Sequence, residues 1–316
     1  MLEETLTIGF LGLGEAGFHI SRGLINAGVP RIVAFDIHQD TPGRGEKIRE
    51  RADTAGVLLV ASNAELLQSS EVILSTVTAD QALHAATQSA LHLKPAHTYA
   101  DLNSVSPNTK KSIAEVIQSA GAKFVEIAIM APVPPYGHKV PMLAGGAAAA
   151  DFAARFSSLG MRAEVVGPQI GIASATKMCR SIMAKGLEAL ITECMLAASY
   201  YGVDERVLAS LAESFPAMDW PKLANYMVGR VVVHGHRRAR EMEEVAETLR
   251  AAGVDPIMTE AIVRRMDWSV EAGLLELFQG EAPASYQDLA GRLQATNGTS
   301  RHAEHKVPPV TATPPL

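Results

Sequence analysis

The feature that most constrains this chain is residues 6–36, which read as a strand, a glycine-rich turn, a helix, a second strand and an acid. The turn fits the pattern G-x-G-x-x-G. In such a turn the first glycine permits the tight bend, the second lets the backbone approach phosphates, and the third lets the helix pack closely on the strand. The helix then directs free N–H groups and its positive dipole end at an anion. We therefore predict a dinucleotide pyrophosphate site formed by Gly12, Leu13, Gly14, Glu15, Ala16 and Gly17.

The second strand of this unit, residues 31–35, ends at Asp36. A carboxylate at this place accepts hydrogen bonds from ribose hydroxyls and repels a 2′-phosphate, which favours NAD over NADP. Arg44 and Arg49 follow closely enough to reach round, so NADP is the second choice. An isolated glycine motif is weak evidence, but here both strands, the helix and the acid accompany it.

Strand-like and helix-like stretches continue to alternate after this unit. Buried strands are predicted at 57–60, 71–77, 97–102 and 123–129, and two further strands at 140–144 and 162–166. Helices between them include 80–90, 106–120 and 148–159. Such alternation predicts an α/β Rossmann domain built on a doubly wound parallel sheet. From residue 169 onward only helical periodicity remains, at 169–200, 204–214, 219–228, 240–251 and 256–277. We expect a Rossmann domain at 1–167, an interdomain helix at 168–200, an all-α C-terminal domain at 201–295 and a disordered tail at 296–316.

Bulk properties exclude several classes of function. The 316 residues carry a net charge of −6 with no basic block before the tail, so nucleic acid is not an expected partner. No apolar run is long enough to span a membrane, and no signal peptide is apparent. The only two cysteines, Cys179 and Cys194, fall in one predicted helix and cannot bridge there, which predicts a reduced, cytoplasmic protein.

Ligands of open parallel sheets bind at the carboxyl ends of the strands, so the residues that follow each strand are candidates. Thr76, Val77 and Thr78 follow the fourth strand and suit a cofactor contact. Asn103 and Ser104 follow the fifth and can bond a cofactor, a carboxylate or a hydroxyl. The next pair, Ser106 and Pro107, reads as an ordinary helix N-cap and first helical residue. After the sixth strand, a proline-rich loop over 130–141 is either a preformed ligand loop or simply a rigid connection.

Two groups of cations in the helical half have both a chemical and a structural interpretation. Lys177 lies in the first third of an otherwise apolar helix, with Arg180 and Ser181 as near neighbours. Beside a nicotinamide a desolvated lysine can transfer the proton of a substrate hydroxyl; otherwise it lies on a solvated helix face. The run 234–241 contains two histidines and three arginines. It either clamps an anion or pairs with Glu241, Glu243 and Glu244; no metal-ligand spacing accompanies the histidines.

Taken together, these motifs come in an order that resembles the β-hydroxyacid dehydrogenase superfamily, which includes 3-hydroxyisobutyrate and 6-phosphogluconate dehydrogenases. The motifs are G-L-G-E-A-G, D-L-N-S-V-S-P, A-P-V-P-P and the long helix with G-x-x-x-x-x-K, within about residues 6–270. The sequences V-P-P-Y-G-H-K-V-P-M-L and H-G-H-R-R-A-R-E-M-E-E-V resemble the subgroup with a phosphogluconate-dehydrogenase-like C-terminal domain.

The resemblance implies that Lys177 is the general acid/base and that substrate contacts come from Asn103, Ser104, Val133, Pro134, Pro135, Arg180, Ser181 and Arg240. Three departures bear on the substrate. The family's A-P-V-S-G-G is A-P-V-P-P-Y here, and proline donates no N–H. The family's asparagine four residues after the lysine is Ser181, and its K-D-L is Arg240-Glu241-Met242.

The leading hypothesis is therefore an NAD-dependent dehydrogenase or reductase that interconverts a hydroxyl and a carbonyl on a small anionic substrate of β-hydroxy acid type. The alternatives are an imine reductase, whose relatives usually replace the lysine by Asp or Tyr, and a non-catalytic NAD-sensing protein. The apolar periodicity of the helices exceeds what one domain can cover, which predicts a homodimer through the helical halves.

Overall fold

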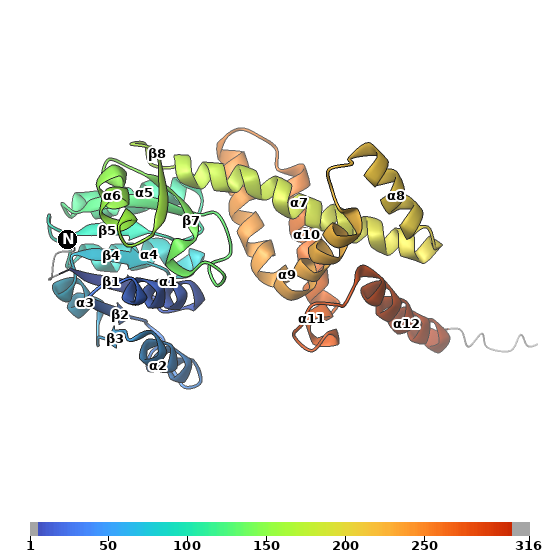
Figure 1. Ribbon diagram of the computed structural model, residues 1–316, viewed down its shortest axis with the longest axis horizontal. Helices are drawn as coiled ribbons and strands as arrows, with labels where there is room; N and C mark the ends of the chain where they lie inside the picture. The colour runs from blue at the N-terminus through green and yellow to red at the C-terminus, as the bar shows by residue number, and fades with distance from the viewer. Residues whose placement is uncertain (1–5, 305–316) are drawn as a thin grey trace, which may run out of the picture. The chain divides into compact units, whose positions relative to one another are not determined.

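The computed structural model describes residues 6–304, which form two compact units (Figure 1). The first unit comprises residues 6–181 together with Glu244–Asp255, and the second comprises residues 182–243 and 256–304. The division between them falls inside the long helix α7 (Ile172–Tyr201), within the segment predicted as an interdomain helix at 168–200. Among residues 6–304, strands occur only in the first unit, so the change from α/β to all-α composition follows the prediction.

The first unit is built on one eight-stranded sheet in the order β3-β2-β1-β4-β5-β6-β7-β8. All neighbouring pairs are parallel except β6 and β7. This reversal has a local cause, because β6 and β7 are joined by the proline-rich loop and the short 3-10 helix η2 (Gly137–Lys139) instead of a crossover helix. The strands are β1 (Thr7–Leu11), β2 (Arg31–Phe35), β3 (Leu58–Leu59), β4 (Val72–Ser75), β5 (Thr98–Asp101), β6 (Lys123–Ile129), β7 (Pro141–Gly145) and β8 (Arg162–Gly167).

Helices cover both faces of the sheet, so the doubly wound α/β fold is confirmed. Side chains of α1 (Glu15–Asn26), α2 (Arg44–Ala55) and α6 (Ala149–Ser157) share one core with one face. Those of α3 (Asn63–Ser69), α4 (Ala82–Ala90, preceded by η1, Ala79–Gln81) and α5 (Pro107–Ser119) share a second core with the other. Both cores use alternate residues of the same strands, as the two-residue period of a strand requires.

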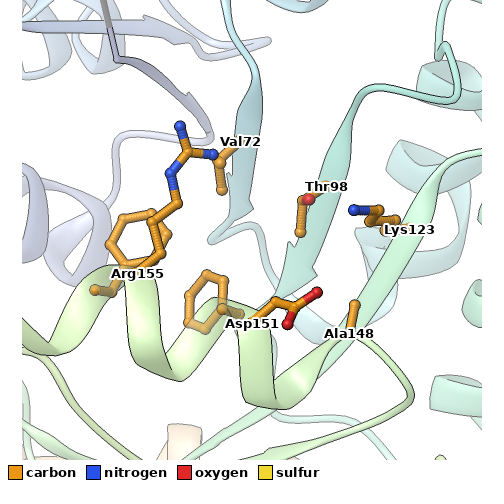
Figure 2. A pocket seen from close by; sticks show the side chains of 8 residues that line it. Val72, Thr98, Lys123, Ala148, Asp151 and Arg155 are labelled. Atoms are coloured by element: carbon orange, nitrogen blue, oxygen red, sulfur yellow. The ribbon is translucent and has the colours of Figure 1, made fainter. Parts of the chain in front are cut away.

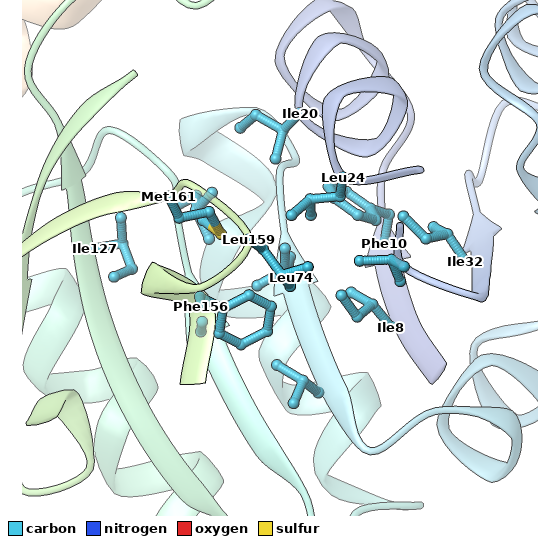
Figure 3. Close-up of a cluster of buried hydrophobic side chains, with 14 of the residues drawn as sticks. Ile8, Phe10, Ile20, Leu24, Ile32, Leu74, Ile127, Phe156, Leu159 and Met161 are labelled. Carbon is cyan, nitrogen blue, oxygen red and sulfur yellow. The ribbon is translucent and has the colours of Figure 1, made fainter. Parts of the chain in front are cut away.

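The core on the first face fixes the helix that follows the glycine-rich turn. Ile20 and Leu24 of α1 pack with Phe10 of β1 and Leu74 of β4 (Figure 3), and all four are fully buried. Burying each such side chain stabilises the fold by about 1.5–3 kcal/mol. The start of α1 is thereby held above the carboxyl end of β1.

The second unit contains only helices among the described residues, and its elements differ from the predicted ones in two places. The segments predicted at 219–228 and 240–251 form one continuous helix, α9, and the segment predicted at 256–277 breaks into α10 and α11 at Gly273, which has φ of +60°. The last helix extends to Glu304, past the start of the tail predicted at 296–316, and residues 305–316 of that tail lie outside the described part. The helices are α7 (Ile172–Tyr201), α8 (Asp204–Ser214), α9 (Trp220–Ala251), α10 (Ile257–Glu271), α11 (Leu274–Leu277) and α12 (Tyr286–Glu304).

Within residues 6–304, none of the helices combines the length and the apolar character needed to cross a bilayer.

Candidate functional site

The glycine-rich turn is held by hydrogen bonds from the strands on either side of β1. The Gly12 N–H donates to the Phe35 carbonyl at 2.8 Å, and the Thr76 hydroxyl donates to the Gly12 carbonyl at 2.7 Å. Gly12 has φ of +91°, and a Cβ there would lie 2.9 Å from the Thr76 carbonyl oxygen. A Cβ on Gly17 would lie 2.6 Å from the Gly12 oxygen. The fold itself therefore requires both of these glycines.

Gly14 differs from the other two glycines of the turn. Its φ of −64° is open to any residue, and a Cβ built on it would meet no atom within 4 Å. Packing and backbone conformation thus leave this glycine unexplained. The space beside it lies at the start of α1, where backbone N–H groups and the helix dipole favour an anion. The arrangement fits a phosphate group that approaches the backbone closely.

Asp36 braces the same turn. Its two carboxylate oxygens accept hydrogen bonds from the Leu13 N–H at 2.8 Å and the His38 N–H at 2.9 Å. Arg51 reaches the Leu13 carbonyl at 3.4 Å, and Arg44 lies 3.4 Å from the His38 ring. The Asp36 carboxylate and the guanidinium groups of Arg44 and Arg51 therefore lie near the carboxyl end of β2.

Asn103 belongs to a buried polar chain at the carboxyl ends of β4 and β5. Its amide N–H₂ donates to the Ser75 hydroxyl at 3.0 Å and also to the Asp101 carboxylate. The other carboxylate oxygen of Asp101 binds Lys110 at 2.5 Å, and Lys110 also donates to the Asp101 carbonyl at 2.7 Å and the Ile127 carbonyl at 3.2 Å. Asn103 is 5% exposed, and its Oδ1 accepts no hydrogen bond from the described part of the chain.

Burial raises the pKa of Asp101, while the Lys110 ammonium and the Asn103 amide favour its charged form. We did not predict this ion pair from the sequence. A signal was nevertheless present, because Lys110 lies on the apolar stripe of α5 with Ile113 and Ile117, where an ordinary surface lysine does not belong. Ser106, by contrast, caps α5 as expected, since its hydroxyl accepts from the Thr109 N–H at 3.2 Å.

Lys177 lies on α7, and the beginning of that helix is fixed to the sheet by a buried acid. Glu126 of β6, which is 0% exposed, accepts hydrogen bonds from the Gly171 N–H at 2.6 Å and the Ser174 N–H at 2.7 Å. An anion at this end of a helix is favoured by the dipole and satisfies N–H groups that have no helical partner. The sequence signal for Glu126 is one acid within an otherwise apolar strand.

The three candidate residues on α7 differ in exposure. Lys177 is half-buried, Arg180 is exposed and reaches the Met130 carbonyl at 3.4 Å, and Ser181 is buried. Met130 directly follows β6 and is the first residue of the proline-rich loop, so Arg180 contacts this loop where it leaves the strand. Ser104 is half-buried after β5.

The proline-rich loop has one buried and one exposed part. The Val133 side chain packs into the core of the first unit, while Pro134 and Pro135 are exposed. The following η2 packs on α1, where the His138 ring lies so close to Gly23 that a Cβ on that glycine would be 2.1 Å from Nδ1. Burial lowers the pKa of His138. The loop is therefore packed against the core at Val133 and exposed to solvent at Pro134 and Pro135.

The three arginines of the basic cluster are all paired within the second unit. Arg237 binds Glu241 one turn along α9, and Arg238 binds Glu188 at 2.8 Å. Arg240, which is about half-exposed, binds Glu243 at 2.6 Å and Asp267 at 2.9 Å. The pairing alternative therefore describes this cluster, with Glu188 and Asp267 as additional partners; Glu244 instead accepts from the Ser106 N–H at 2.9 Å.

A small cavity of about 90 Å³ lies at the amino-terminal ends of the strands, beside the first residues of β4, β5 and β6 (Figure 2). Lys123, Asp151 and Arg155 contribute its charged groups, and Arg155 pairs with Glu71 at 2.9 Å. The amino ends of the strands are not where doubly wound sheets bind nucleotides. This cavity is therefore separate from the candidate site.

Comparison with known families matches two parts of the chain. Residues 7–151 match the NAD binding domain of 6-phosphogluconate dehydrogenase. Residues 198–269 match DUF1932, a domain of unknown function.

Three individual proteins illustrate the similarity. A conserved hypothetical protein from Sinorhizobium meliloti 1021 is 40% identical, with a TM-score of 0.71 over 83% of this chain and 88% of that one. A conserved protein of unknown function, described as structurally similar to 3-hydroxyacid dehydrogenases, is 33% identical, with a TM-score of 0.69 over 85% and 98%. The mitochondrial 3-hydroxyisobutyrate dehydrogenase of Drosophila melanogaster is 25% identical over 67% of this chain and 64% of its own length.

Proposed function

The chain belongs to the β-hydroxyacid dehydrogenase superfamily, and from this premise we propose that it is an NAD-dependent dehydrogenase or reductase that interconverts a hydroxyl and a carbonyl on a small anionic substrate. The observation that carries the proposal is Gly14, whose missing side chain serves neither packing nor backbone conformation. A glycine of this kind at a helix start is expected where a phosphate approaches the backbone.

The turn Gly12–Gly17 would hold the pyrophosphate, Asp36 the adenosine ribose, and Thr76, Val77, Thr78 and Asn103 the remainder of the dinucleotide. Asp36 supports NAD over NADP, because its carboxylate repels a 2′-phosphate. When bound, the nicotinamide supplies the acceptor or donor of a hydride.

Lys177 is the proposed general acid/base. It takes the proton of the substrate hydroxyl during oxidation and returns a proton to the carbonyl oxygen during reduction. The anchoring of α7 by Glu126 supports this role, because a proton-transfer group requires a fixed position.

The proposed substrate is anionic because Lys177 and Arg180 bring two cations within one turn of α7. Ser104, Ser181 and the exposed Pro134 and Pro135 complete the proposed contacts of the first unit. Val133 would support the loop from within the core rather than touch substrate directly. Arg240 would act on substrate only by exchanging its pairs with Glu243 and Asp267.

The nucleotide site is tested by Gly14→Val. We expect the free energy of unfolding to fall by at most about 1 kcal/mol, because valine is a poorer helix N-cap than glycine. The affinity for NAD, measured by calorimetry, should fall at least about tenfold, which corresponds to about 1.4 kcal/mol. Gly291→Val is the matched control, since a Cβ at Gly291 in α12 also meets no described atom within 4 Å. Unchanged NAD affinity in Gly14→Val would remove the basis of the proposal.

The enzyme and the sensor are distinguished by Lys177→Ala. With small hydroxy acids and NAD or NADP, followed by the absorbance of the reduced nicotinamide, kcat should fall about 10²- to 10⁴-fold while NAD affinity persists. Lys123→Ala, at the amino-terminal end of β6, should leave kcat and NAD affinity unchanged. A non-catalytic protein would bind NAD without turnover of any substrate in the panel.

We also propose a homodimer through the helical unit. Large apolar side chains are exposed there, among them Met183, Leu190, Tyr201, Ile257 and Met258. A group of large apolar side chains exposed on one unit is expected at an interaction site.

We further propose a reducing, cytoplasmic compartment, with which the free thiols of Cys179 and Cys194 agree.

A further inference from the structure

The side-chain amide of Asn103 has only one orientation that its surroundings accept. Asp101 can only accept hydrogen bonds as a carboxylate, and the Asn103 N–H₂ group donates to it and to Ser75. Turning the amide over would place its carbonyl oxygen against the Asp101 carboxylate. The donor side of Asn103 is therefore committed inward.

Lys110 maintains this arrangement from the other side of Asp101. Its ammonium is 1% exposed and has three acceptors, two from Asp101 and one from Ile127. The short contact between the two groups favours the charged form of the Asp101 carboxylate against the effect of burial. The pair thus fixes both the position and the acceptor character of Asp101.

The consequence is a buried acceptor with no donor. Within residues 6–304 no group donates a hydrogen bond to Asn103 Oδ1, and such a buried atom is costly unless a donor reaches it. Its place is informative, because Asn103 bonds Ser75, the last residue of β4, and the next residue, Thr76, bonds the Gly12 carbonyl of the glycine turn. Ser75 and Thr76 therefore connect Asn103 to the turn that forms the proposed pyrophosphate site.

We propose that Asp101 and Lys110 are positioning residues that hold Asn103 as an obligatory acceptor for a hydroxyl or amide N–H on the nicotinamide riboside half of the dinucleotide. This inference rests on the proposed function. It assigns a task to two residues that touch no ligand themselves, and it predicts that the polarity at position 103, more than its bulk, determines binding.

Exchanging the side chains of Asp101 and Asn103 provides the sharpest test. In Asp101→Asn, the carbonyl of the introduced amide faces Lys110 and its N–H₂ group faces Asn103, so the Asn103 amide must turn over and offer a donor to the ligand. In the double variant Asp101→Asn/Asn103→Asp, the carboxylate introduced at position 103 accepts from the amide introduced at position 101 and again offers an oxygen outward. The double variant has the net charge of the original chain.

The affinities of NAD and ADP are measured for each variant by calorimetry, since ADP lacks the nicotinamide riboside. We expect Asp101→Asn to lower the affinity for NAD about tenfold and the affinity for ADP less than about twofold. The double variant should regain an NAD affinity within about threefold of that of the original chain. If Asp101→Asn does not fold, Asn103→Ala replaces it, because that change leaves the Asp101–Lys110 pair intact and should weaken NAD alike.

Equal NAD affinity in the single and double variants overturns the inference, as does a change confined to the KM of the substrate. An original chain that binds neither ADP nor NAD would instead refute the proposed function. The two failures are therefore distinguishable.

Discussion

At the scale of single residues, the same residue type serves different purposes within a few positions. Gly12 and Gly17 are required by backbone conformation and close packing, whereas Gly14 is required by neither. The sequence pattern predicts all three glycines, but only the three-dimensional structure separates those that the fold needs from the one that a ligand would need. The same separation applies to Asp36, whose carboxylate braces the turn and also faces the proposed ribose site.

The cofactor preference is tested at Asp36. Asp36→Asn removes the negative charge but keeps one acceptor oxygen, so repulsion of a 2′-phosphate is lost while Arg44 and the His38 ring remain nearby. We expect the ratio of NADP to NAD affinity to rise about tenfold. Asp40→Asn, at an exposed aspartate of the same loop, is the control and should leave the ratio unchanged. A ratio that does not move with Asp36→Asn would show that another group selects the cofactor.

Glu188 gives a prediction about pH. Burial raises its pKa to about 7 from 4.5, against the opposing effect of Arg230. Between these values the native state retains a proton that the unfolded state has lost, so the free energy of unfolding falls as pH rises, by at most about 1.4 kcal/mol per pH unit. Thermal melts between pH 5 and pH 7 should show this slope, and Glu188→Gln should reduce it. An identical slope in both proteins would contradict the assignment to Glu188.

At the scale of elements, local patterns predicted most strands and helices, and tertiary contacts account for the differences. The two helices predicted at 219–228 and 240–251 are one continuous helix, α9, and Gly235 lies between the two predicted segments. A Cβ on Gly235 would lie 1.9 Å from the Ser269 hydroxyl of α10, so this glycine permits close helix packing and does not end a helix. The buried pair Asp101–Lys110 and the acid Glu126 were missed for a related reason. Asp101 and Lys110 lie on different elements, and Glu126 bonds residues 45 and 48 positions away, so local sequence patterns do not reveal which groups these buried charges contact.

The anchoring of α7 is an element-scale prediction. Glu126→Gln keeps one oxygen for the Gly171 and Ser174 N–H groups but removes the charge that the helix dipole favours. We expect a loss of about 1–2 kcal/mol in the free energy of unfolding, measured with denaturant, and a lower kcat at unchanged NAD affinity. Glu164→Gln, at an exposed acid of β8, is the matched control. Equal stability of the two variants would show that the buried acid does not anchor the helix.

At the scale of the whole molecule, the two units bury their apolar surface to different degrees. In the first unit, helices on both faces enclose the sheet between two large cores. The second unit has one smaller core and leaves large apolar side chains exposed on α7 and α10. Isolated apolar residues on a surface need no explanation, but a concentration of them on an all-helical unit points to a partner.

The chain offers a matched pair of leucines that tests whether this partner is a second copy. Leu190 on α7 is 56% exposed and Leu58 on the edge strand β3 is 55% exposed, so the same substitution at each changes a similar amount of apolar surface. If two helical units pack together, Leu190→Lys places a charge in the interface and Leu58→Lys does not, since a lysine on an edge strand is well tolerated. Light scattering after gel filtration should give twice the 33.6 kDa chain mass for the original protein and for Leu58→Lys. Leu190→Lys should approach the single-chain mass on dilution, because a buried unpaired cation weakens association. One chain mass for all three proteins would exclude the homodimer and leave the apolar face to a different partner.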